Sequence, residues 1–123
     1  MTSEVPRMKF YDEHRMADIR EQLERTVLRW QGVSSKQMMG CLCYFRGSKF
    51  FAFLVTRGIV ITKLPEDGRM ILLKRMKGEA FEMAGRTVKT WIKVPLVKPT
   101  DVRLVLPYVK KSYQAASVTK KKS

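Results

Sequence analysis

The chain has few of the residues that most often act in catalysis or bind metals. It has one histidine, His14, two cysteines, Cys41 and Cys43, and only 11 acidic residues against 25 lysines and arginines. Two cysteines make no disulfide framework, and with one remote histidine they cannot supply the four ligands of a structural zinc site. No apolar run reaches about 18 residues, and the polar N-terminus has no apolar signal core. We predict a cytoplasmic protein without metal, cofactor or membrane contact.

The same scarcity argues against catalysis. His14, the only histidine that could activate a serine or cysteine nucleophile, lies outside the predicted domain. The sequence also has no nucleophile-elbow motif. The seven glycines are scattered over turns and element ends, so they form no phosphate-binding loop. Glu79 and Glu82 lie on or near a predicted hairpin, where carboxylates are usually solvated. We therefore predict that the protein is not an enzyme and has no small-molecule substrate.

Basic residues, in contrast, are abundant in this chain. The net charge is +14, and in residues 1–30 six bases cancel six acids. Residues 31–123 therefore carry the whole excess, with 19 bases against five acids. A field of this sign attracts polyanions and speeds their association. The predicted partner is nucleic acid or another acidic molecule, and a general gain in solubility is the alternative.

Periodicity predicts one folded domain over residues 17–117. Apolar side chains at helical spacing predict an amphipathic helix over residues 18–30, which Asp18 and Glu21 open as a capping box. Residues 1–16 show no clean period and are predicted to be a flexible extension whose removal leaves the domain folded. Residues 118–123 are predicted to be a disordered basic tail.

The rest of the domain alternates between strand and helix patterns. A second helix is predicted between Pro65 and Gly78, with Met70, Ile71, Leu73 and Met76 as its apolar stripe. A final helix is expected to start at Thr100 and to be kinked or divided at Pro107. Period-two patterns and turn residues predict strands over 36–45, 49–57, 58–64, 80–83 and 87–94. The order α-β-β-β-α-β-β-α indicates an α+β two-layer sandwich with a five-stranded antiparallel sheet.

The strand in Gly85–Pro95 presents two different faces. Alternation predicts a core face of Val88, Thr90, Ile92 and Val94. The other face holds Thr87, Lys89, Trp91 and Lys93, with Arg86 at the preceding turn. Cations and a flat ring are the combination that single-stranded nucleic acid binds. The alternative is that Trp91 packs at a sheet edge or a dimer seam, covered by the lysine stems. The second predicted helix adds three bases that are expected to extend the positive surface: Lys74, Arg75 and Lys77.

Two further patterns bear on packing. Cys41 and Cys43 are two residues apart in a strand, so both thiols share one face and are expected to be small buried side chains. Residues 50–55 are apolar on both faces, although helices are expected to cover only one side of the sheet. This pattern indicates a homodimer that pairs its open sheet faces.

Several short elements resemble the TfoX N-terminal domain family. Lys36-Gln-Met-Met39-Gly40 resembles the family's Lys/Arg-Met-Phe-Gly element, with Met39 where phenylalanine is usual. The residues Gly85, Arg86, Lys89, Trp91, Val94 and Pro95 match a second element, and residues 108–113 resemble the family's tail. The resemblance spans about residues 17–117 and implies the same α-β(3)-α-β(2)-α arrangement. It also implies a regulatory role, since the family is named for regulators of bacterial competence.

The predicted function is therefore a non-enzymatic regulatory module that associates with nucleic acid. The alternative is a homodimeric protein-interaction adaptor that binds no nucleic acid.

Overall fold

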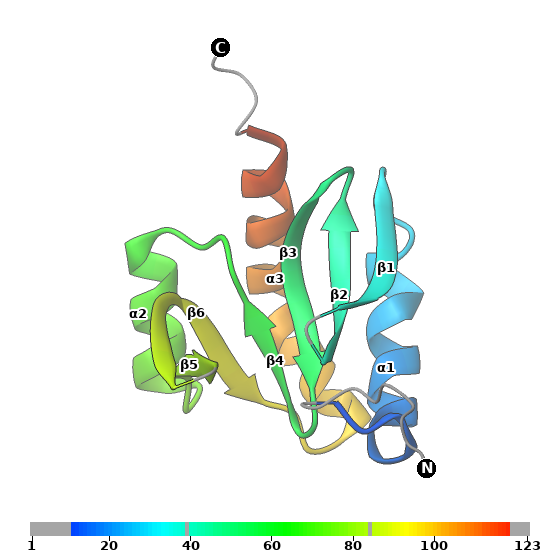
Figure 1. The fold of residues 1–123 in the computed structure, drawn as a ribbon, viewed down its shortest axis with the longest axis horizontal. Coiled ribbons are helices and arrows are strands. Elements are labelled where there is room, and N and C mark those ends of the chain that lie inside the picture. The colour runs from blue at the N-terminus through cyan, green and yellow to red at the C-terminus, as the bar shows by residue number, and fades with distance from the viewer. Residues whose placement is uncertain (1–10, 39, 84, 119–123) are drawn as a thin grey trace.

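Three helices lie on one side of a curved, six-stranded antiparallel sheet (Figure 1). The computed structural model describes residues 11–38, 40–83 and 85–118, and the predicted basic tail beyond Val118 lies outside them. The strands are arranged in the order β1-β2-β3-β4-β6-β5. The elements are α1 (Glu13–Val27), β1 (Val33–Met38), β2 (Cys41–Arg46), β3 (Lys49–Val55), β4 (Gly58–Ile61), α2 (Glu66–Arg75), β5 (Glu79–Met83), β6 (Arg86–Pro95), a 3-10 turn (Pro99–Asp101) and α3 (Val102–Val118).

The α+β class and the antiparallel sheet are confirmed, but the strand count is six rather than five. The segment predicted as one strand over 36–45 contains the end of β1, a turn and most of β2. Met38 pairs with Cys41 across that turn, and Gly40 has a φ of +76°. Glycine reaches this left-handed backbone without steric cost, so the chain reverses here and gains an edge strand.

The first helix begins earlier than predicted. Asp12, and not Asp18, is its N-cap, with a carboxylate that accepts a hydrogen bond from the backbone N–H of His14. Tyr11 and Met16 are buried in the core. Residues 11–16 therefore belong to the folded domain, and the predicted boundary at residue 17 is wrong. The helix also ends at Val27, three residues before the predicted end.

The second helix buries a different residue from the predicted stripe. Leu72 is fully buried, whereas Met70, Ile71 and Leu73 are each about two-fifths exposed. Apolar side chains lie around much of this helix, so periodicity could not select the buried side. The α2 helix packs mainly against β6 and leaves its surface toward α3 open.

The C-terminal helix runs over Val102–Val118 with Pro107 inside it, rather than as two segments. Pro107 is the sixth residue of this helix, so its missing N–H leaves one backbone hydrogen bond of the helix unmade, and the helix continues past it. The entry turn is held by Asp101 rather than by the predicted cap Thr100. The Asp101 carboxylate accepts hydrogen bonds from the backbone N–H groups of Val97, at 2.9 Å, and Lys98, at 3.2 Å. The Val97 hydrogen bond is the main cause that lowers the pKa of Asp101.

The sheet separates two apolar clusters. The larger cluster joins the helices to one sheet face through side chains such as Leu23, Phe51 and Val105. The smaller cluster occupies the opposite face, and none of its described members comes from a helix. Its buried members are Cys41, Cys43, Phe53, Val55, Val60 and Phe81, and its half-buried members are Met38, Phe45, Phe50, Met83 and Trp91. The angled β5–β6 hairpin in Figure 1 supplies three of these side chains, so the chain covers much of this face itself.

A buried hydroxyl fastens α3 to the sheet. Ser112 donates a hydrogen bond of 2.6 Å to the carbonyl of Phe51 and accepts one of 2.9 Å from the backbone N–H of Lys63. Phe51 is the extra residue of a bulge in β3, since Phe50 and Ala52 pair with adjacent residues of β2. Its carbonyl accepts both from the Ser112 hydroxyl and, at 3.2 Å, from the backbone N–H of Thr62, so one oxygen joins α3 to the segment that follows β4.

Replacing Ser112→Ala is expected to lower the free energy of unfolding by about 1–3 kcal/mol, because the Lys63 N–H loses its acceptor inside the protein. Urea unfolding followed by circular dichroism measures this change. The exposed Ser35→Ala on β1 is the control, with an expected change within about 0.5 kcal/mol. Equal effects of the two variants would contradict this role for Ser112.

Candidate nucleic-acid interface

The β5–β6 hairpin contains a large irregularity at the predicted binding strand. Ala80 pairs with Ile92, yet the next residue, Phe81, pairs with Val88. Three residues of β6, 89–91, therefore have no opposite partner in β5. Such a bulge bends a strand and re-aims its side chains. The predicted alternation holds for Ile92, which is buried on the helix side, but Thr90 from the same predicted face is exposed.

Trp91 is half-buried and belongs to the smaller apolar cluster. Its ring lies 5.5 Å from the rings of both Phe50 and Phe53, with interplanar angles of 81° and 77°. These edge-to-face contacts are favourable aromatic geometry. Trp91 is thus a packing residue of the sheet, although β6 lies between β4 and β5 and not at a sheet edge.

Trp91 also lines a surface hollow of about 480 Å³ at the hairpin. We call it the hairpin hollow; its lining residues are Met83, Arg86, Thr87, Val88, Lys89 and Trp91. Arg86 and Lys89 are exposed, so two cations and one indole ring meet there. Three of the seven predicted binding residues are brought together.

Lys93 lies apart from this group. Its aliphatic stem covers Gly58, where an added Cβ would be 3.1 Å from the lysine Cε. Lys93 is opposite Glu79 in the sheet, and both line a separate hollow that also includes Glu82. Two carboxylates beside this lysine make the local surface mixed in charge rather than positive.

The three helix bases lie at the C-terminal end of α2. Lys77 adopts a left-handed backbone with φ of +58°, and the N–H of Gly78 returns to the carbonyl of Leu72 at 2.9 Å. A Cβ at Gly78 would lie 2.8 Å from that carbonyl oxygen and from Ile92, so only glycine fits where the helix end meets β6.

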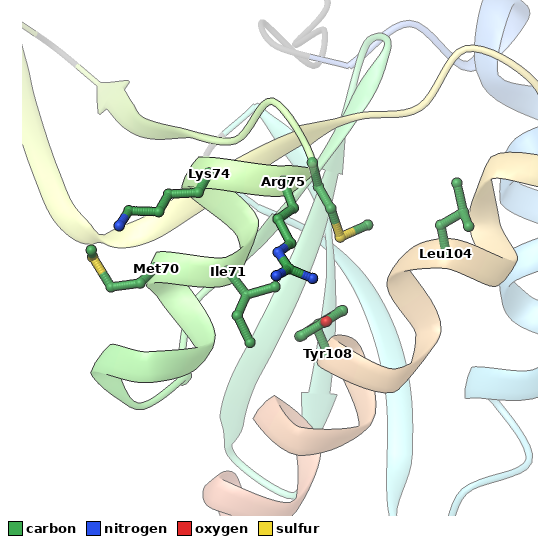
Figure 2. A pocket seen from close by; sticks show the side chains of 7 residues that line it. Met70, Ile71, Lys74, Arg75, Leu104 and Tyr108 are labelled. Atoms are coloured by element: carbon green, nitrogen blue, oxygen red, sulfur yellow. The ribbon is translucent and has the colours of Figure 1, made fainter.

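Lys74, Arg75 and Lys77 line two adjoining hollows that together we call the α2–α3 groove. The larger, of about 660 Å³, lies between α2 and α3 and is shown in Figure 2. The smaller, of about 320 Å³, extends toward Val97 and shares Arg75, Met76 and Leu104 with the first. The seven predicted residues are therefore divided among three depressions of the surface.

The ion pairs among the described residues are confined to α1 and its N-cap. The four ion pairs among the described residues all lie within residues 12–25. Arg20, for example, contacts Glu13 at 2.9 Å and Glu24 at 3.0 Å. In the described part of 31–118, no lysine or arginine is within 4.0 Å of a carboxylate oxygen. The described bases of this part of the chain are therefore not held in ion pairs.

A second cluster of cations and rings was not predicted. The Lys110 ammonium lies 4.7 Å from the centre of the Trp30 ring, and the Arg46 guanidinium lies 4.1 Å from that of Tyr113. The two rings are 5.0 Å apart. Three segments distant in the sequence meet here, so no local pattern could reveal the cluster.

The two thiols are buried, as predicted, on the sheet face opposite the helices. Burial raises the pKa of Cys41 to about 12, with a further contribution from Cys43, and burial alone raises that of Cys43 to about 11. A thiol with such a pKa is protonated at neutral pH and is a poor nucleophile. His14 is exposed in the first turn of α1.

No protein-family model, curated protein or solved structure matches the chain. The resemblance to the TfoX N-terminal domain family therefore stays a prediction. No helix among the described residues is long and apolar enough to cross a lipid bilayer.

Proposed function

We propose that this protein is a non-enzymatic regulatory module, similar to the TfoX N-terminal domain, that associates with nucleic acid through the hairpin hollow. The observation that carries the proposal is the meeting of Arg86, Lys89 and Trp91 in one depression of the surface, where neither base forms an ion pair with a described carboxylate. A phosphate can accept from the two cations while a base contacts the indole ring.

The packing of Trp91 supports this role rather than opposing it. Phe50 and Phe53 hold the ring from the sheet side, so little rotamer freedom is lost when a base contacts it. Recognition of this kind is tolerant of sequence, since every base has a flat face. We propose single strands as the ligand, since their bases are free to reach a ring inside a hollow.

Replacing Trp91→Leu is expected to weaken binding of a fluorescent single-stranded oligonucleotide by about 1–3 kcal/mol, the usual contribution of one base–ring contact. Anisotropy titrations measure the affinity, and circular dichroism confirms that the variant is folded. Trp30→Leu is the matched control, because it removes the other half-buried tryptophan, which lies outside the hairpin hollow. Unchanged affinity with folded Trp91→Leu protein would contradict the proposal.

The contribution of local charge is tested separately from the net charge. Arg86→Gln with Lys89→Gln should reduce the dependence of log K on log salt by about 0.7–0.9 for each lost phosphate contact. Arg15→Gln with Arg25→Gln lowers the net charge equally, but these bases already pair with carboxylates in α1 and its cap. If both pairs reduce binding equally, attraction is by net charge alone and the hairpin hollow is not the site.

A homodimeric adaptor that pairs its open sheet faces is the second proposal, and the structure offers it less support. In the described part of the chain, no large apolar side chain of the smaller cluster is among the exposed ones. The large exposed apolar residues include Met70, Ile71, Val97 and Leu104, which line the α2–α3 groove instead. A monomeric mass by light scattering at tens of micromolar would exclude the dimer.

A further inference from the structure

Four of the six large apolar side chains that are exposed among the described residues line the α2–α3 groove. Val97 is 75% exposed, Leu104 is 62% exposed, and Met70 and Ile71 of α2 are close to 40% exposed. The larger hollow also includes Met76 and Tyr108 among its lining residues. Clustered apolar exposure of this kind is typical of an interaction site, whereas isolated apolar residues need no explanation.

The charge around the larger hollow has one sign. None of the described residues that line the larger hollow is acidic, and Lys74 and Arg75 are both exposed there. Figure 2 shows Arg75 directed from α2 toward Tyr108 on α3. The smaller hollow adds Lys77 and one acid, Asp101, whose carboxylate is already occupied by two backbone N–H groups.

We propose that the α2–α3 groove binds an acidic, amphipathic helical segment of a partner protein. Aliphatic side chains of such a helix would contact Met70, Ile71 and Leu104, and its flanking carboxylates would pair with Lys74 and Arg75. This is the helix-in-groove mode, in which apolar residues one turn apart anchor one helix against the surface of another. Methionines suit such a groove because their flexible side chains adapt to different apolar groups.

The lining also distinguishes this partner from the other candidates. Nucleic acid presents phosphates and flat bases, whereas the larger hollow offers one ring, Tyr108, among mainly aliphatic walls. A second copy of this chain is disfavoured because both copies carry +14, and like charges oppose close approach. An acidic helix matches the cations and the aliphatic surface together. The inference concerns a different surface from the hairpin hollow and does not depend on nucleic-acid binding there.

The test uses three labelled peptides, each about 15 residues long, with the full-length protein in anisotropy titrations. The first has leucines on one helical face and glutamates on the flanks, the second is a scramble of it, and the third has lysines in place of the glutamates. We expect the first to bind at least about tenfold more tightly than the others. Equal affinity of the first and the scrambled peptide, or no binding of the first, would overturn the proposal.

Variants then locate the binding. Leu104→Asn is expected to weaken the acidic peptide at least about tenfold, since burial of one leucine contributes that much or more. Leu28→Asn is the matched control, an exposed leucine at the end of α1 that should change affinity less than about threefold. A similar loss in both variants would overturn the location.

Charge reversal supplies the most specific result. Lys74→Glu with Arg75→Glu should weaken the acidic peptide at least about tenfold and strengthen the lysine peptide by a similar factor. Arg15→Glu with Arg25→Glu makes the same change in net charge on α1 and should leave the preference for the acidic peptide in place. If a single-stranded oligonucleotide, and not the acidic peptide, loses affinity in the groove variants, the occupant is nucleic acid and the proposal is wrong.

Discussion

Deleting residues 1–16 is expected to unfold the domain, contrary to the prediction from sequence that they form a dispensable extension. The deletion removes Tyr11 and Met16 from the core and removes the N-cap Asp12 from α1. It also breaks two links to the β3–β4 turn. The Asp12 N–H donates to Thr56 at 2.8 Å, and the Arg57 N–H donates to the Met16 sulfur at 3.1 Å.

The size of these losses is comparable with the stability of a domain. Truncating one buried methionine costs about 2–5 kcal/mol, and losing an N-cap costs about 0.5–2 kcal/mol. Whole domains are stable by about 5–15 kcal/mol, so the deleted protein should lack a cooperative unfolding transition. Circular dichroism during heating and urea titration measures this result.

A point variant tests the contribution of the Met16 side chain alone, without deleting any of the backbone. Met16→Ala is expected to lower the free energy of unfolding by about 2–5 kcal/mol. The control His14→Ala changes an exposed residue of the same helical turn and should stay within about 0.5 kcal/mol. A fully stable deletion variant would show that residues 11–16 are not part of the domain.

Alkaline pH is expected to destabilise the protein strongly. Four buried groups have pKa values raised above those of the unfolded chain: Tyr11, Cys41, Cys43 and Tyr44. Burial is the largest cause for each. The Tyr44 hydroxyl also donates to the Glu24 carboxylate at 2.7 Å, whose charge opposes ionisation of the phenol and raises its pKa further.

The sign of the effect follows from proton binding. Above about pH 9 the unfolded chain loses protons from its thiols and then from its phenols, while the folded state keeps them. The unfolded state then binds fewer protons, so the free energy of unfolding falls as pH rises. Since each pH unit counts about 1.4 kcal/mol per group, the two thiols alone remove about 5 kcal/mol between pH 9 and 11.

Urea unfolding under reducing conditions at pH 7, 9, 10 and 11 measures this loss. Tyr44→Phe should be less stable than wild type at pH 7, because it lacks the hydrogen bond to Glu24, but it should lose less stability between pH 10 and 11. Lysine neutralisation above pH 10 reduces charge repulsion equally in both proteins and cancels in the comparison. A free energy of unfolding that stays constant from pH 7 to 11 would contradict this account.

The sequence alone determined the elements with strong local signals. The apolar spacing in α1, the turn glycines and the long apolar run in β3 predicted an α+β fold with an antiparallel sheet. The spacing of Cys41 and Cys43 placed both thiols on one buried face, because side chains alternate along a strand. These features depend on residues that are neighbours in the chain. Local geometry is therefore sufficient to predict them.

The tertiary structure decided what depends on distant partners. Met16 belongs to the folded domain because it contacts the β3–β4 turn, about forty residues away in the sequence. The predicted row of Lys89, Trp91 and Lys93 was divided because β6 pairs with β5 on one side of a bulge and again on the other. Likewise, the exposed side of α2 depends on which apolar residue is buried where this helix packs on β6. That residue is Leu72, so Met70, Ile71 and Leu73 stay partly exposed. Register and packing are set by the whole chain, since each burial competes with every other. They decided which of the predicted residues lie together, and they formed between α2 and α3 a groove that no local pattern indicated.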